Sequence, residues 1–252
     1  MTLYLIGMGL ADEKDITMKG LEAIRKCDKI YLENYTSLLQ CTVKDLEQFY
    51  GKKIILADRD ISEQGGEKIV EEAKKKSIAF LVIGDPFSAT THIELFRLAK
   101  IKKIPIEVIH NASILTAIGT TGLQLYKFGK TTSIPFPEKV PNLETPYYNI
   151  KENHERGLHT LLLLDIEAQE HKFMAVNQAM DILQKIENRK KENVFNDDTL
   201  VVACARLGSE NQQIQAGPVG ELKRRDFGPA PHCLIVPGKL HFIEEAMLQL
   251  WR

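Results

Sequence analysis

The stretch Ile78-Ala79-Phe80-Leu81-Val82-Ile83-Gly84-Asp85-Pro86-Phe87-Ser88-Ala89-Thr90-Thr91-His92 decides how this chain is interpreted. Its apolar first half, ended by Gly-Asp-Pro, predicts a buried strand that stops in a tight turn. Pro86 biases Asp85 away from helical geometry, so we expect the Asp85 carboxylate at the carboxyl end of a parallel strand. Open α/β sheets bind ligands at that edge, which indicates a small-molecule site. A structural Asx turn that caps the following helix is the alternative interpretation.

Length and composition restrict the class of protein. The chain has 252 residues, enough for one large core or two modest ones, and its net charge of -1 argues against a nucleic-acid partner. No segment approaches the ~20 apolar residues of a membrane span, and the first residues lack the basic region of a signal peptide. The four cysteines form no CxxC pair, so we expect buried free thiols in the reducing cytoplasm.

Strand-like and helix-like segments alternate along the chain, a pattern typical of parallel crossover units. We therefore predict an α/β protein with mostly parallel sheets in two domains, residues 1–129 and 130–252, with a proline-rich stretch (135–146) near the change. The expected strands are 2–6, 29–33, 53–56, 78–83, 106–109, 132–136, 160–165, 200–205 and 232–236. The expected helices are 17–26, 43–49, 67–76, 91–102, 114–121, 147–156, 176–189 and 240–251, with turn and short helix over 217–225.

The glycine turn Gly7-Met8-Gly9-Leu10 follows the first expected strand. It does not match a dinucleotide fingerprint, because Asp12 stands at the third glycine position and the next helix begins too late to bind a pyrophosphate. Two interpretations stay open: a plain tight turn, and a backbone-lined pocket in which the glycines let another ligand approach closely.

Further polar or small residues follow other expected strands. In the first half these are His110-Asn111-Ala112-Ser113; in the second half they are Leu164-Asp165, Ala205-Arg206-Leu207-Gly208-Ser209 and Pro231-His232. A ligand site between two domains would collect both sets. His110 and His232 are candidate general bases, although structural packing or a backbone hydrogen bond of each ring is an alternative of at least equal weight.

The chain lacks the common catalytic motifs. Its histidines show no HxxxH or HExxH spacing, and no GxSxG elbow, Walker loop or CxxC pair occurs, so we expect no metal site. Strand-end residues without an obvious nucleophile favour group transfer by positioning. Methyl transfer from a sulfonium fits this pattern, because in-line displacement at an activated methyl group requires mainly alignment of the two reactants.

Several segments together resemble the diphthine synthases, a branch of the tetrapyrrole-methylase-like (class III) S-adenosylmethionine methyltransferases. The resemblance extends essentially from end to end of the chain. It is carried by residues 3–10, 15–21, 84–92, 108–114, 122–129, 157–166 and 198–200.

The resemblance implies two α/β domains with S-adenosylmethionine in the cleft between them, and S-adenosylhomocysteine as the product. By position, the first domain would contribute Leu10, Asp85, Ser88, Ser113 and Ile114 to the cofactor site. The second domain would contribute Leu164, Leu207 and His232. Asp85 would be the fixed anion near the cationic sulfonium or the amino group. No catalytic residue can be assigned from the sequence.

The resemblance also implies a substrate, the aminocarboxypropyl-histidine of translation elongation factor 2, whose amine is methylated on the route to diphthamide. Archaeal members stop at the trimethylated amine, and eukaryotic members also esterify the carboxylate. Phe87 and Asn111-Ala112-Ser113 resemble the eukaryotic branch, which we favour, whereas residues 170–172 and 236–241 resemble the archaeal branch. The family tends to form homodimers. The alternatives are a tetrapyrrole (porphyrinoid) methylase and a catalytically silent binding module of the same fold.

Overall fold

The computed structural model describes residues 1–35, 37–57, 66–140 and 143–252. The chain divides into two compact units, Met1–Ala117 and Ile118–Arg252, so the division falls before the expected boundary after residue 129. The segment between these two positions packs with the second unit: Phe128 forms a parallel bridge with His159, and the Gln124 N–H donates to Glu244. Pro141, one of the prolines near the expected boundary, lies outside the described residues.

The first unit is built on a five-stranded sheet in the order β3-β2-β4-β1-β5, and all of its pairings are parallel. Its strands are β1 (Leu3–Gly7), β2 (Lys29–Glu33), β3 (Ile55–Ala57), β4 (Ile78–Val82) and β5 (Ile106–Ile109). Its helices are η1 (Glu13–Asp15), α1 (Met18–Lys26), α2 (Val43–Tyr50), α3 (Gly66–Glu72), α4 (Ile93–Ile101) and α5 (Ile114–Ala117).

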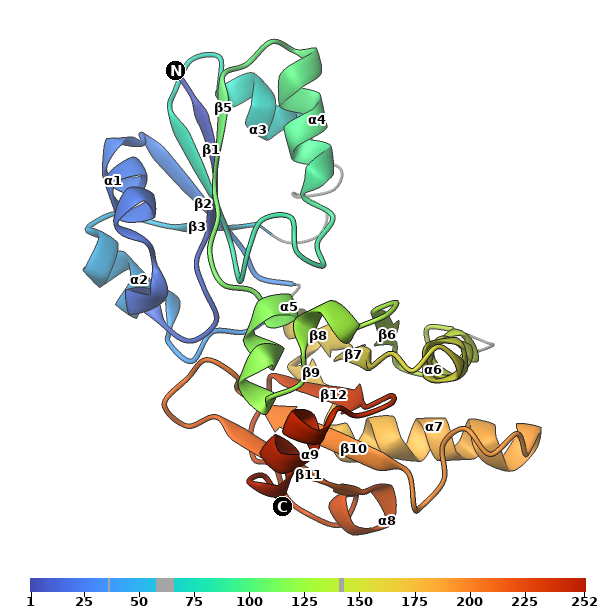
Figure 1. Ribbon diagram of the computed structural model, residues 1–252. Coiled ribbons are helices and arrows are strands. Elements are labelled where there is room, and N and C mark those ends of the chain that lie inside the picture. Colours follow the sequence, from blue (N-terminus) through green and yellow to red (C-terminus); the bar gives the residue numbers. More distant parts are fainter. Residues whose placement is uncertain (36, 58–65, 141–142) are drawn as a thin grey trace. The chain divides into compact units, whose positions relative to one another are not determined.

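Helices cover both faces of this first sheet (Figure 1). Successive side chains of a strand point to opposite faces, so Leu3 and Leu5 of β1 join the core under α3 and α4. Ile6 and Met8 join the core on the other face, under α1 and α2. Because all five strands run in the same direction, their carboxyl ends meet at one edge, as the sequence predicted.

Local capping signals explain where the first helices begin and end. The Thr17 side chain accepts a hydrogen bond from the Gly20 N–H and starts α1, as an N-cap should. Thr42 and Asp45 form a reciprocal capping box at the start of α2. That helix ends at Gly51, whose φ of 68° is the left-handed conformation that glycine adopts without strain.

The second unit contains a five-stranded sheet in the order β11-β10-β12-β7-β6, with a separate two-stranded sheet of β8 and β9. Its strands are β6 (Thr132–Ile134), β7 (Thr160–Leu164), β8 (Ile166–Glu167), β9 (Lys172–Phe173), β10 (Leu200–Ala205), β11 (Gln213–Pro218) and β12 (His232–Val236). Its helices are η3 (Ile118–Thr121), η4 (Leu125–Lys127), α6 (Thr145–Glu155), η5 (Ala168–Glu170), α7 (Val176–Lys190), α8 (Val219–Leu222) and α9 (Phe242–Gln249).

The α/β class is confirmed, but the expectation of mostly parallel strands is wrong for the second sheet. Only β6 and β7 pair in parallel there, and the other three pairings are antiparallel. Strand β11 was not expected; it forms an antiparallel pair with β10, and β12 then inserts between β10 and β7. Local periodicity indicates that a segment is a strand, but the direction of its neighbours depends on the connections between strands.

One large core fills the face of the second sheet beneath α6 and α7. The apolar stripe of α7 supplies Val176, Ala179, Met180, Leu183 and Ile186 to it. All four cysteines of the chain are free thiols; three are buried and Cys41 is half-buried. None of the helices among the described residues is long and apolar enough to cross a membrane.

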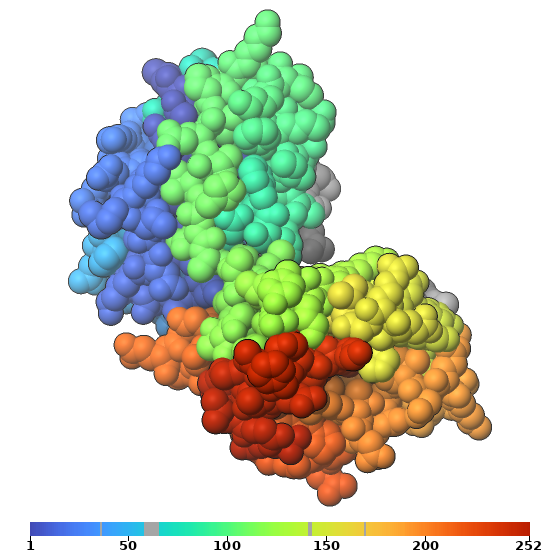
Figure 2. Space-filling model, viewed as in Figure 1, coloured from blue at the N-terminus to red at the C-terminus, as the bar shows by residue number. Residues whose placement is uncertain are grey.

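A buried carboxylate ties the carboxyl-terminal helix α9 to the rest of the second unit. Figure 2 shows the end of the chain, in red, on the surface of this unit, yet Glu244 of α9 is 0% exposed. Its carboxylate accepts hydrogen bonds from the Gln124 and His241 N–H groups, from His159 Nε2 and from Lys127 Nζ. Burial opposes ionisation, but these donors outweigh it and lower the pKa of Glu244 to about 2.

We expect Glu244→Gln to lower the free energy of unfolding by about 3 kcal/mol, because removing one partner of a buried ion pair leaves the other uncompensated. Chemical denaturation followed by circular dichroism measures this change. Glu245→Gln is the matched control, since Glu245 lies on the same helix but is exposed. Equal stability of the two variants would show that the carboxylate network does not hold α9.

The same network predicts a pH dependence of stability. The pKa of Glu244 is lower in the folded state than its ordinary value of 4.5, so its contribution is present above that pH and is lost as the pH falls towards about 2. The stability difference between wild type and Glu244→Gln should therefore be largest near neutrality and shrink through this window. Denaturation curves at pH 7 and pH 3 test this, and a constant difference contradicts it.

Candidate functional site

The loops after three adjacent strands are joined at the carboxyl edge of the first sheet. Strands β4, β1 and β5 are neighbours, and each is followed by one of the segments singled out in the sequence. Gly9 and Gly84 exchange backbone hydrogen bonds of 3.3 and 2.7 Å, with φ values of 80° and 82° that favour glycine. The glycine turn and the Asp85 turn therefore form one structure.

The glycines are required by close contacts, one between two loops and one within the loop after β1. A Cβ atom at Gly7 would lie 2.6 Å from the carbonyl oxygen of Gly84, and one at Gly9 would lie 2.5 Å from Cβ of Asp15. The Asp15 carboxylate accepts hydrogen bonds from the N–H groups of Leu10 and Ala11 at 2.9 and 2.7 Å. The tight-turn interpretation thus accounts for both glycines, without an approaching ligand.

Asp85 lies at the centre of this edge and is 7% exposed. One carboxylate oxygen accepts from the Phe87 N–H at 3.0 Å, which is the Asx turn considered above, and from the Ser88 hydroxyl at 3.3 Å. The other accepts from His110 Nδ1 at 2.7 Å and from the Asn111 N–H at 3.2 Å. Burial opposes ionisation, but the hydrogen bonds from Phe87, His110 and Asn111 outweigh it and keep the pKa of Asp85 below its usual value.

Asn111 closes the third loop against the first. Its side-chain amide donates to the carbonyl oxygens of Gly7 and Asp15, both at 3.0 Å. Ser113 and Ile114 follow at the start of α5, and the Ser113 side chain is buried. The structure therefore brings the five predicted first-domain residues to one sheet edge, and adds Asp15 and Asn111 as the side chains that hold it together. Both stand in segments that the resemblance covers, but nothing in their local pattern predicts these partners.

The three predicted residues of the second half also meet at one edge of their own sheet. Leu164 ends β7, Leu207 follows β10 and His232 begins β12. Because β12 runs antiparallel to both neighbours, its first residue pairs with Ala205, at the end of β10. The Arg206 N–H donates to the Pro231 carbonyl at 2.8 Å and joins the two connecting segments.

His232 presents a buried nitrogen that has no partner among the described residues. Its Nε2 lies 3.0 Å from the Pro229 carbonyl oxygen, which can only accept, so Nε2 carries the proton and Nδ1 carries the lone pair. Nδ1 is buried without a hydrogen bond. Burial lowers the pKa of His232, and the Arg206 charge acts in the same direction, so the ring is neutral at physiological pH.

Arg206 positions the loop that precedes His232. The side chain is buried, and its guanidinium donates to the carbonyl oxygens of Phe227, Pro229 and Asn211. Arg206 lies in one of the strand-end segments of the sequence, but its local pattern predicts no role for it. An arginine in an otherwise small and apolar turn was the available signal, because such a residue is rarely buried unless it is paired.

His92, the last residue of the opening motif, is a further buried histidine in the first unit. It is 4% exposed, its Nε2 lies 3.3 Å from the Tyr35 hydroxyl and its Nδ1 has no partner among the described residues. Its ring packs against Phe80, and burial lowers the pKa of His92 to about 4. The ring is therefore neutral and enclosed by aromatic neighbours.

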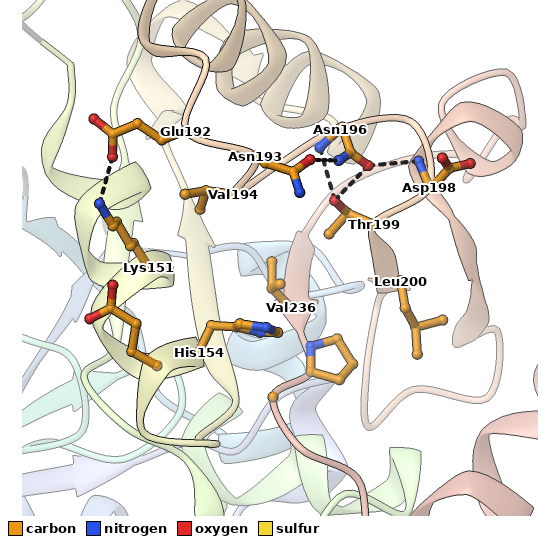
Figure 3. Close-up of a pocket in the computed structure, with 13 residues that line it drawn as sticks. Lys151, His154, Glu192, Asn193, Val194, Asn196, Asp198, Thr199, Leu200 and Val236 are labelled. Atoms are coloured by element: carbon orange, nitrogen blue, oxygen red, sulfur yellow. Dashed lines mark hydrogen bonds and ion pairs between the residues drawn. The ribbon is translucent and has the colours of Figure 1, made fainter.

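A pocket of about 490 Å³ lies elsewhere in the second unit (Figure 3). It is formed by the end of α6, the loop after α7, the start of β10 and the end of β12. Val194, Leu200 and Val236 contribute apolar surface, and a Lys151–Glu192 ion pair of 2.7 Å lies at its rim. The pocket is at the sheet edge opposite to Leu164 and His232, and no predicted site residue lines it.

Comparisons with known proteins agree with the architecture. A model of the tetrapyrrole (corrin/porphyrin) methylases matches residues 2–223. The diphthine synthase of Methanocaldococcus jannaschii is 50% identical over 250 residues, which are 98% of this chain and 97% of that protein. The diphthine methyl ester synthase of Dictyostelium discoideum is 46% identical over 269 residues, with 100% of this chain and 98% of that protein covered.

Solved structures show the same similarity. A crystal structure of a diphthine synthase superimposes with a TM-score of 0.90 at 37% sequence identity, and covers 100% of this chain and 96% of that chain. The family model matches more than half of the chain, and the relatives match it nearly from end to end. The chain therefore belongs to the tetrapyrrole (corrin/porphyrin) methylase family and is a methyltransferase.

Proposed function

We propose that this chain is the S-adenosylmethionine-dependent methyltransferase of diphthamide biosynthesis that acts on the aminocarboxypropyl-histidine of translation elongation factor 2. The observation that carries the proposal is the nearly complete coverage of this chain by relatives named diphthine synthase and diphthine methyl ester synthase. We also propose that it acts in the cytoplasm, as a homodimer, without binding nucleic acid or a membrane.

Residues of both units are proposed to bind S-adenosylmethionine. Leu10, Asp85, Ser88, Ser113 and Ile114 are the proposed contacts from the first unit, and Leu164, Leu207 and His232 those from the second. The unpartnered Nδ1 of His232 supports this assignment, because a buried acceptor without a hydrogen bond is costly unless a ligand supplies the donor. S-adenosylmethionine carries such donors on its adenine and its amino group.

The bound cofactor supplies an activated methyl group on a cationic sulfur. The chain's contribution is to hold the acceptor in line with that methyl group, which supplies much of the acceleration. The ionised Asp85 adds a fixed negative charge at the edge of the first sheet, where it favours a nearby cation. The mostly apolar residues proposed from the second unit contribute packing and exclude water.

We propose that methylation continues from the trimethylated amine to the methyl ester of the carboxylate. Phe87 and Asn111, which resemble the eukaryotic branch, both lie in the hydrogen-bonded network around Asp85. Relatives with both names have similar identities to this chain: 50% for a diphthine synthase and 46% for a diphthine methyl ester synthase.

Incubation with methyl-labelled S-adenosylmethionine and elongation factor 2 that carries aminocarboxypropyl-histidine tests the function. We expect label on that residue, and mass spectrometry of the peptide should show three N-methyl groups and one methyl ester. A folded enzyme that leaves the factor unlabelled contradicts the proposal, and methylation of a porphyrinoid in its place would select the tetrapyrrole alternative. A chain that binds no S-adenosylhomocysteine in calorimetry would have no cofactor site.

Replacing Asp85 should weaken cofactor binding. We expect Asp85→Ala to reduce the affinity for S-adenosylhomocysteine by about 1–3 kcal/mol, because the loops lose the shared acceptor of four hydrogen bonds and the site loses a charge. Isothermal titration calorimetry measures the change. Asp28→Ala is the matched control, since Asp28 also accepts a backbone hydrogen bond, from Ser77, before β2 and β4 begin. Equal affinities of the two variants would remove Asp85 from the site.

A further inference from the structure

The Asp85–His110 pair has the geometry of an oriented base. Asp85 is ionised and can only accept, so the 2.7 Å contact fixes the proton on His110 Nδ1. When the ring is neutral, its lone pair is then on Nε2. In an imidazole the hydrogen bond at one nitrogen decides which function the other nitrogen performs, so Nε2 is left as the proton acceptor.

His92 and His232 differ from His110 in how accessible their rings are to a substrate. The His92 ring is enclosed, with a pKa of about 4, and His232 uses Nε2 on a backbone carbonyl while its lone pair is buried. The His110 side chain is 67% exposed, although the Asp85 side chain that holds it is buried. Of these three rings, His110 alone combines an Nδ1 held by a carboxylate with a side chain that is mostly exposed.

Packing limits the rotation of the His110 ring without covering it. The Phe87 ring contacts its edge at 6.1 Å between centroids and is itself held against Phe96. Asp85 is the titratable group in contact with His110 among the described residues. The His110 ring therefore contacts one carboxylate and one aromatic side chain, both from the turn after β4.

The proposed reaction needs such a base in some of its steps only. Before each N-methylation the acceptor nitrogen is an ammonium, and one N–H proton must leave before the lone pair attacks. The nitrogen then bonds to the methyl carbon, the carbon–sulfur bond breaks and its electron pair stays on sulfur as a thioether. Ester formation differs, because a carboxylate is already deprotonated at neutral pH and attacks without losing a proton.

We propose that His110 is the general base that removes the ammonium proton before each N-methylation, with Asp85 as its positioning residue. Nε2 takes the proton from the nitrogen and releases it to solvent from the exposed side of the ring. This inference rests on the function proposed above and assigns the catalytic residue that the sequence left open. Proton removal by a positioned side chain contributes about a hundredfold or more to such a step.

His110→Asn tests the assignment, because the asparagine amide can still donate to Asp85 while the outward lone pair is lost. We expect single-turnover N-methylation of elongation factor 2 to slow by about a hundredfold or more. Affinity for S-adenosylhomocysteine should be unchanged, and so should ester formation on a factor that is already trimethylated. His171→Asn is the matched control, since His171 is exposed in the second unit and its φ of 51° suits asparagine.

Chemical rescue by a small base distinguishes a catalytic role of His110 from a purely structural one. The exposed His110 position leaves room for a small base, so added imidazole should restore N-methylation by His110→Ala but not accelerate the wild type. N-methylation by His110→Asn at the wild-type rate overturns the proposal, as does an equal loss of amine and ester methylation or of cofactor affinity. An inactive wild type would instead overturn the proposed function, and this inference with it.

Discussion

The carboxyl edge of the first sheet depends on the hydrogen bonds that the Asp85 carboxylate accepts. It accepts four hydrogen bonds from two loops, and the Gly9–Gly84 backbone pair joins the third loop to them. A buried carboxylate is stable only when such donors replace the water it has lost. The consequence is a rigid edge at which an ionised group and a histidine stand side by side.

In the second unit, two other buried charged side chains, Arg206 and Glu244, hold loops and a helix in place. The Arg206 guanidinium holds the loop before β12 through backbone carbonyls, and this loop fixes the tautomer of His232. At a different place the Glu244 carboxylate fastens α9 to the segment after η3. Arg206 is satisfied by backbone carbonyl groups. Asp85 and Glu244 each accept from two backbone N–H groups and from two side chains.

Much of the first unit could be predicted, because its elements follow simple periodic signals. Apolar runs such as 78–82 and the N-cap at Thr17 are local features, and parallel strands separated by helices leave few possible arrangements. The strand order and directions of the second sheet are harder to predict from the sequence. Its β10–β11 hairpin contains no intervening helix, and Gly217-Pro218 at its end favoured a turn, so the strand Gln213–Pro218 and the antiparallel pairings were missed.

The amino-acid sequence is enough to predict the α/β class, the strand ends that carry polar residues and, through resemblance, the methyltransferase family. Which groups share a proton depends on the folded structure. The hydrogen bond between Asp85 and His110 joins residues from different loops, 25 positions apart, and depends on β4 and β5 flanking β1. Local patterns describe a segment and its own faces, whereas the orientation of a histidine lone pair is set by partners that the chain brings near only when it folds.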